Sequence, residues 1–442
     1  MSLDALEALI AHAKRAGADS ADAILVSRTS LTVERRLGRT ETLERAEMRD
    51  LGLRVFIGQK SASVSASSVD AEKFATIAER AVAMARIVPE DPFSGLADNA
   101  RTPDDAAYLD LDDGAEPTVD SLIARADAAE HAAMAVPGVT NSEGGNAGFS
   151  RTEIMLATSN GFAGRAMRTN HAISASVLAG TGTAMQRDYD YHSTVHFADL
   201  DAPDLIGRHA GEQAVARLNP TRPATTKLPV VFSPRVSASL LGHLIGAING
   251  ASIVRGTSFL KDAVGTRIFP AGMFVHDDPR RVRGTRSGTF DGEGLPTTAR
   301  AIIEDGVLTG WLLDCRSARA LGLPPTGHAS RGTGGPPSPS PTNLFMAPGT
   351  QTPESLIGDV ANGLYVTELI GMGVNGLTGD YSRGAAGFMI RQGKLAEPVA
   401  EVTIASNLRD MFATLTAAND LVFRRGMDAP TLRITEMMLA GA

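Results

Sequence analysis

Residues 21–67 have an alternating apolar and polar character, after a stretch with helical spacing at residues 3–16. Such alternation is typical of strands with one buried and one solvated face. Gly38, Gly52 and Gly58 stand at or beside breaks in the pattern. We therefore expect a helix, then an antiparallel meander of short strands, then a second helix that begins after Asp70.

The next part of the chain repeats this mixture of helix and strand. Residues 88–118 are rich in Pro, Asp and Gly and predict a long surface loop. Helical spacing returns at 121–136 and 204–218, on either side of strand-like segments at 139–200. The run 219–227 contains prolines and has no apolar period, so we place the main domain boundary there. The first predicted domain, residues 1–222 with the 88–118 loop inside it, is a sheet with helices on one side.

The second predicted domain, residues 223–442, is larger and richer in strands. A buried-type strand at 228–232 leads into a helix at 234–249, with Ser233 as its N-cap and Gly250 beyond its end. Asp305-Gly306 predicts a hairpin, and residues 406–420 read as a helix. Most of the remainder alternates strands with glycine turns. We expect an α+β protein whose C-terminal domain is β-rich and barrel-like.

Composition narrows the classes of function. The net charge of −8 opposes a nucleic-acid role, because clustered Lys and Arg supply affinity for phosphates. The arginines at 280, 281, 283 and 286 form either a local basic patch or a solvated loop. A single cysteine excludes an internal disulfide. No apolar run is long enough to span a membrane and the start lacks a secretion signal, so a cytoplasmic location is the default expectation.

Three motifs match known binding or catalytic patterns, but the residues around each motif do not favour that function. GMGVNG at 371–376 matches a dinucleotide fingerprint, but no helix pattern follows it, so a glycine turn between strands is expected. His192 and His196 lie in a strand-like context, where residues four apart are about 13 Å apart and cannot share one ion. They read as solvent-facing or cross-strand histidines. Cys315 follows an apolar segment and reads as a half-buried small residue rather than a nucleophile.

The helix at 234–249 carries a histidine beside its apolar stripe. The stripe is formed by Val236, Leu240, Leu241, Leu244, Ile245 and Ile248. His243 lies on its flank, and its neighbours one turn away, Ser239 and Ala247, offer no second strong ligand. On these residues alone, His243 is a boundary histidine.

Several separated blocks, in this order, resemble the TldD/PmbA family, and within it the PmbA (TldE) branch. They are LLGHLIGAINGASIVRGTSFLKDAVG, FDGEGLPTTARAIIEDGVLTGWLLD, ARALGLPPTGHA, VTELIGMGVNGLTGDYSRGAAGF and EVTIASNLRDMF. The resemblance is densest over residues 230–412, and the strands LTVERRLGRT and DLGLRVFIG also suit the family.

The resemblance implies a two-part system. TldD-type chains are zinc metallopeptidases with HExxxH on a helix and a further cysteine ligand near the C-terminus, whereas PmbA-type chains lack the metal site and pair with TldD. Here Gly242 and Ala247 stand at the two histidine positions and His243 at the glutamate, and Asp428 lies in the C-terminal segment that has no cysteine. The resemblance thus implies no cofactor in this chain and zinc in a TldD-type partner.

The function expected is that of a non-catalytic subunit of a cytoplasmic heteromeric metallopeptidase that processes unfolded peptides, in toxin–antitoxin turnover or microcin maturation. Strands VTELIG and AAGFMIR are candidates to line its chamber. Asp380, Tyr381, Ser382 and Arg383, on the adjoining glycine-rich turn, are candidate peptide contacts or an ordinary structural turn. A homodimer is possible when the chain is alone. The alternatives are a stand-alone metallopeptidase with a non-standard site and a binding protein that modulates DNA gyrase.

Overall fold

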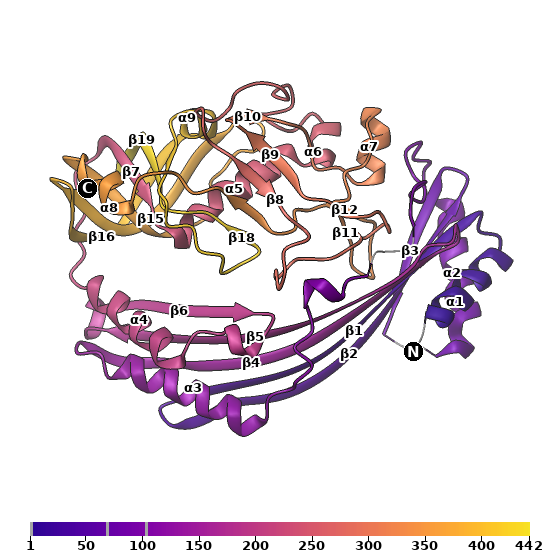
Figure 1. The fold of residues 1–442 in the computed structure, drawn as a ribbon, viewed down its shortest axis with the longest axis horizontal. Coiled ribbons are helices and arrows are strands. Elements are labelled where there is room, and N and C mark those ends of the chain that lie inside the picture. Colours follow the sequence, from indigo (N-terminus) through magenta and orange to yellow (C-terminus); the bar gives the residue numbers. More distant parts are fainter. Residues whose placement is uncertain (1–2, 68–69, 102–104) are drawn as a thin grey trace.

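The computed structural model describes residues 3–67, 70–101 and 105–442. A long curved sheet from the N-terminal half forms one layer, and a compact β-rich body from the C-terminal half lies over one of its faces (Figure 1). This confirms the α+β class. No helix within the described residues is long and apolar enough to cross a membrane.

The N-terminal sheet is antiparallel, with strand order β3-β2-β1-β4-β5-β6. The strands are β1 Ser20–Arg36, β2 Arg39–Ile57, β3 Lys60–Ala66, β4 Val139–Thr158, β5 Ala163–Ala179 and β6 Gln186–Thr194.

The predicted series of short strands was wrong in one respect: residues 20–66 form three strands, two of them long. Leu25, Leu31 and Val33 are buried and lie at odd-numbered positions, so they point to the same face of the sheet. Strand β1 therefore continues from one to the next without a break. Gly38 and Gly58 do occupy turns, with φ of 73° and 55°. Gly52 instead lies inside β2, where an added Cβ would come within 2.4 Å of the Thr333 carbonyl oxygen. That glycine permits close contact with the C-terminal body.

Among the described residues, four helices cover the face of the sheet that points away from the C-terminal body, as Figure 1 shows for α3 and α4. This confirms the expected one-sided packing. Asp70 caps a short 3-10 turn that leads into α2. The helices are α1 Leu3–Arg15, α2 Phe74–Ile87, α3 Val119–Met134 and α4 Pro203–Ala216, and the 3-10 turns η1 Ala71–Lys73, η2 Ala107–Leu109, η3 Gly182–Ala184 and η4 Phe197–Asp199 complete this half.

The C-terminal body is built on a closed barrel. Its strands follow the order β16-β15-β14-β7-β19, and β19 pairs back onto β16 to close the ring. Only the β7–β14 pair is parallel. This confirms the barrel-like expectation. The strands are β7 Thr226–Phe232, β14 Asn362–Ile370, β15 Asp380–Arg391, β16 Lys394–Asn407 and β19 Leu432–Ala440, with β17 Thr416–Ala417 attached to β19.

A smaller sheet and short helices surround the barrel. The sheet has the order β10-β9-β8-β13-β18, and Asp305-Gly306 forms the predicted β9–β10 hairpin. The helix expected at 406–420 is shorter, because Asn407 caps it and the chain turns into β17 after Ala413. The remaining elements are α5 Pro234–Ile248, α6 Gly250–Val254, β8 Val275–Asp277, β9 Arg300–Glu304, β10 Val307–Leu308, α7 Cys315–Leu321, β11 Ala329–Ser330, β12 Ser338–Pro339, β13 Leu344–Met346, α8 Pro353–Gly358, β18 Met427–Asp428 and α9 Leu408–Ala413.

Arginines of the C-terminal body hold the two layers together. Arg319 donates to the carbonyl oxygens of Phe93 and Gly95 at 3.2 and 3.3 Å, in the loop predicted at 88–118. Arg283 pairs with Asp110 and Asp199 at 2.7 and 2.9 Å. Arg283 is exposed, as expected for a solvated loop, and it also forms ion pairs with acidic residues of the other layer.

Candidate functional site

Helix α5 is placed by the apolar stripe that the sequence predicted. Leu240, Leu241, Leu244, Ile245 and Ile248 are buried in a core that they share with the barrel strands. Ser233 occupies the N-cap position and Pro234 the first turn, although the Ser233 hydroxyl makes no capping bond.

Gly250 was predicted to lie beyond a helix end, yet it begins a new helix. The amide of Asn249 separates α5 from α6, since its Oδ1 accepts from the Ala251 N–H at 3.0 Å. Gly250 is needed for space: an added Cβ would meet the Ser317 Oγ at 2.5 Å.

The three positions matched to HExxxH differ in environment. Gly242 is exposed, and the nearest atom to an added Cβ would be the Met427 Sδ, at 4.0 Å. Ala247 is buried, with 3% of its surface exposed, and its carbonyl oxygen accepts from the Ser258 hydroxyl at 2.5 Å. Helix α5 therefore faces the segment of Asp428, but from positions without ligand atoms.

His243 packs against Tyr381 rather than against a carboxylate. The ring centroids are 5.8 Å apart and the planes are 81° apart, an edge-to-face contact. Neither the His243 Nε2 nor the Tyr381 hydroxyl has a hydrogen-bond partner among the described residues, and both are buried. Burial, reinforced by the positive charge of Arg383, lowers the pKa of His243 to about 4. The imidazole is therefore neutral at physiological pH.

The predicted peptide-contact residues lie on a strand rather than on a turn. Asp380 begins β15, and the glycine turn precedes it at residues 371–379, as expected for GMGVNG. Asp380 accepts from the Thr378 hydroxyl at 2.6 Å and from the Asn407 amide at 3.1 Å, and these two bonds hold the pKa of Asp380 below its usual range. Asp380 and Ser382 are exposed, Arg383 is half-buried, and Tyr381 is buried.

Asp428 does not offer a free carboxylate. It is 6% exposed on β18, and its Oδ1 accepts from the backbone N–H groups of Arg424 and Arg425 at 3.1 and 3.0 Å. Burial nevertheless raises the pKa of Asp428 above its usual range.

These residues do not fit a zinc ion. A zinc site needs three or more nitrogen, sulfur or carboxylate ligands around one point. Gly242 and Ala247 supply none, and the described part of the chain contains no cluster of three His, Cys, Asp or Glu placed to hold a metal.

The other candidate residues have structural partners. His192 lies on β6, but His196 falls past its end, and both are largely buried rather than solvent-facing, His192 beside Asp201 and His196 beside Asp110 and Asp113. Cys315 begins α7 and does not follow a strand; it is buried, not half-buried. Burial and Glu293 raise the pKa of the Cys315 thiol, so it is no activated nucleophile.

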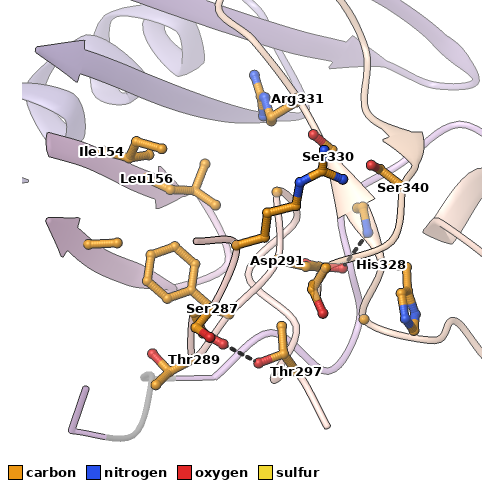
Figure 2. A pocket seen from close by; sticks show the side chains of 18 of the residues that line it. Ile154, Leu156, Ser287, Thr289, Asp291, Thr297, His328, Ser330, Arg331 and Ser340 are labelled. Atoms are coloured by element: carbon orange, nitrogen blue, oxygen red, sulfur yellow. Dashed lines mark hydrogen bonds between the residues drawn. The ribbon is translucent and has the colours of Figure 1, made fainter. Parts of the chain in front are cut away.

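Sequence reasoning missed a pocket of about 450 Å³ between the two layers, here called the interface pocket. Figure 2 shows Ile154 and Leu156 of β4 on one wall and Ser287, Asp291 and Ser330 of the C-terminal body across from them. The pocket also contains three arginines, Arg168, Arg286 and Arg331. A polar Arg168 within the alternating strand was the available signal, but its partners are distant in sequence.

Comparisons with known proteins agree with this architecture. The chain matches models of PmbA/TldA metallopeptidase domain 1 over residues 21–85, the central domain over 112–218 and the C-terminal domain over 225–441. A metalloprotease PmbA of Escherichia coli O157:H7 is 36% identical, over 96% of this chain and 92% of its own length. The chain therefore belongs to the PmbA/TldD metallopeptidase family. Within that family it is a PmbA/TldE-like protein, as the sequence resemblance predicted.

Solved structures share the whole fold. One from Bacteroides thetaiotaomicron, described as a candidate modulator of DNA gyrase, has a TM-score of 0.89 at 27% identity and covers 99% of this chain and 98% of its own. TldE from Thermococcus kodakarensis has a TM-score of 0.87 at 21% identity, covering 99% of this chain and 100% of its own, which shows the fold alone. A TldD homologue of Haemophilus influenzae is 27% identical over 45% of this chain and 42% of its own length.

Proposed function

We propose that this chain is the non-catalytic subunit of a cytoplasmic heteromeric peptidase whose TldD-type partner holds zinc and cuts unfolded peptides. The observation that carries the proposal is helix α5, which keeps its packed stripe while Gly242 and Ala247 lack metal-binding atoms. Without a metal to activate water, the neutral His243 has no nucleophile to deprotonate. Cleavage and zinc are accordingly assigned to the partner, and no cofactor to this chain.

In this proposal the chain forms part of the wall that receives the peptide. Backbone hydrogen bonds to an extended peptide are indifferent to its sequence, which suits a peptidase for unfolded chains. Asp380, Ser382 and Arg383 present polar groups near the start of β15, beside the glycine turn, and we assign them to peptide contact. Tyr381, being buried, acts instead by packing against His243.

Co-expression with an HExxxH-bearing TldD homologue tests the proposal. We expect the two chains to co-purify and to cleave an unfolded peptide in a chelator-sensitive reaction that neither chain performs alone. A partner whose HExxxH glutamate is replaced by Gln is the control, and its complex should form without activity. Failure to associate would contradict the pairing. Stoichiometric zinc and cleavage by this chain alone would instead support a stand-alone metallopeptidase.

Modulation of DNA gyrase is a second candidate, favoured by the description of the Bacteroides relative. It would operate through protein contact, because the net charge of −8 disfavours binding to DNA. A measured effect of the purified chain on gyrase supercoiling, absent for the TldD-type homologue, is the expected result for this candidate.

A further inference from the structure

The interface pocket contains more positive charge than its own acidic groups neutralise. Arg168, Arg286 and Arg331 line it, whereas Asp291 is the one carboxylate among its described lining residues. Asp291 already accepts three backbone N–H bonds, from Glu293, Leu295 and Ala329, at 2.9, 2.9 and 3.0 Å. These three bonds occupy its oxygens but do not fully offset burial, which raises the pKa of Asp291 above its usual range.

Two of these arginines hold buried donors without acceptors. The Nε of Arg168 and the Nε and Nη2 of Arg331 have no hydrogen-bond partner within the described chain. Arg331 uses Nη1 to bind Asp22 at 2.5 Å, and its side chain is 1% exposed. Arg168 donates from Nη2 to the Ser287 carbonyl oxygen. An unpaired buried N–H is costly, so the arrangement is complete only when an acceptor enters.

Repulsion between the positive charges of Arg168 and Arg286 also favours the binding of an anion in the pocket. Burial, together with the nearby charge of Arg286, lowers the pKa of Arg168 to about 10. A second carboxylate would relieve this repulsion, and guanidinium groups match carboxylates in bidentate geometry. Asp22 does not supply this relief, since it is shared between Arg331 and Arg54.

Part of the pocket lining is apolar. Ile24, Ile154, Leu156 and Phe290 contribute aliphatic and aromatic surface. A bare inorganic anion would leave this apolar lining without a partner, whereas a carboxylate attached to an apolar side chain would contact both the arginines and the apolar residues. The C-terminal residue of a peptide has this chemistry.

One arginine of the interface pocket approaches the segment beside the degenerate metal site. The Arg286 side chain lies across Gly426, where an added Cβ would meet its Nε at 2.3 Å. The next residue, Met427, is the one whose sulfur faces Gly242 of α5. One arginine therefore spans from the pocket to the segment that borders α5.

We propose that the interface pocket binds the C-terminal carboxylate of a peptide, with Arg168 and Arg331 as its donors, Arg286 as a supporting charge and the β4 wall as the seat of an apolar side chain. The proposal rests on the proposed function, because that function supplies the peptide. It adds a specific anchor for one end of the substrate.

The test compares two forms of one short fluorescent peptide with an apolar last residue, a free acid and a C-terminal amide, by anisotropy with the full-length chain. We expect the amide to bind about tenfold to a hundredfold more weakly, the usual range for a lost charge-assisted hydrogen bond. Arg168→Gln should abolish the difference. Arg165→Gln is the matched control on the same strand, where Arg165 pairs at the surface with Glu153 and should leave the difference intact.

The other results of this binding experiment either support or overturn the proposal. Equal binding of acid and amide, absence of binding by either, or a difference that survives in Arg168→Gln overturns the proposal. Arg168→Lys keeps the charge without the planar fork, and we expect it to retain a reduced preference for the acid, which separates recognition from misfolding. Full displacement by millimolar inorganic phosphate, with no preference for the acid, would also overturn it. None of these results depends on co-purification with a TldD-type chain, so failure of the pairing is read separately.

Discussion

His243 is a titratable side chain that the fold keeps uncharged. In the unfolded chain its pKa is about 6.5, whereas burial and Arg383 lower it to about 4 in the folded protein. Below pH 6.5 the unfolded state takes up a proton that the folded state does not, so stability is lost as pH falls toward 4. Above pH 6.5 both states are neutral and the effect vanishes.

His243→Phe should remove this acid sensitivity. Phenylalanine keeps the edge contact with Tyr381 and has no unpaired nitrogen. We expect the free energy of unfolding to change by less than about 1 kcal/mol at pH 7.5, and the variant to be more stable than the parent by up to about 3 kcal/mol near pH 4. Urea unfolding at both pH values measures this. His131→Gln, at an exposed site on α3, is the control. Parallel loss of stability in His243→Phe and the parent would refute the assignment.

The contact between His243 and Tyr381 lay beyond the reach of sequence reasoning. Helical spacing placed His243 correctly at the flank of an apolar stripe, because that depends on neighbours within one turn. Tyr381 belongs to a strand of the barrel that is distant in sequence, and tertiary packing brings it to α5.

At the scale of an element, two glycines of the α5–α6 region are predicted to respond oppositely to alanine. Gly242 lies in the interior of α5, and an added Cβ would meet nothing closer than 4.0 Å. Gly242→Ala should therefore stabilise the protein by about 0.5–1 kcal/mol through helix propensity. Gly250→Ala should destabilise it by about 1–3 kcal/mol, because the added methyl would lie 2.5 Å from the Ser317 Oγ. Thermal and urea unfolding compare the two, and equal effects would contradict the difference in packing.

Elements were predicted correctly where the local sequence pattern determines them. They were predicted wrongly where contacts between the two layers determine them. The β9–β10 hairpin followed from Asp305-Gly306, whose φ values of 47° and 79° are those of a type I′ turn. Gly52 suggested a turn for the same reason that glycines usually do. A glycine is needed at this position because the backbone of Thr333, which belongs to a distant loop, lies against it. Nothing near Gly52 in the sequence reveals that approach.

At the scale of the whole molecule, a buried ionic group connects the two layers. Asp22 of β1 accepts from Arg54 of β2 and from Arg331 of the C-terminal body, and both arginine side chains are at most 7% exposed. Burial alone would raise the pKa of Asp22, but the two arginines hold it below its usual value. Asp22 gains its second arginine partner, Arg331, only when the layers are assembled.

Asp22→Asn should destabilise the protein by about 3–5 kcal/mol, because it leaves two buried guanidinium groups without a compensating charge. Urea unfolding of the full chain measures this change. Glu153→Gln, which breaks the exposed pair with Arg165, is the matched control and should cost no more than about 1 kcal/mol. Equal costs for the two variants would show that the ionic group does not join the layers.

The sequence pattern predicted the α+β class and the barrel-like part but not the pocket between the layers. Periodicity reports which face of a strand is buried, whereas Arg168 and Arg331 become neighbours of one cavity only through packing of the layers. The interface pocket could therefore not be predicted from the sequence pattern.

Closure of the barrel has a consequence for the order of synthesis. Strand β19 pairs with β7 on one side and with β16 on the other, so the ring stays open until residues 432–440 have left the ribosome. During translation β7 lacks its neighbour β19, which is synthesised about two hundred residues later. Pairing between strands so distant in sequence is slow to form. In that interval the unpaired edges of β7 and β16 present free backbone groups with which another chain can pair.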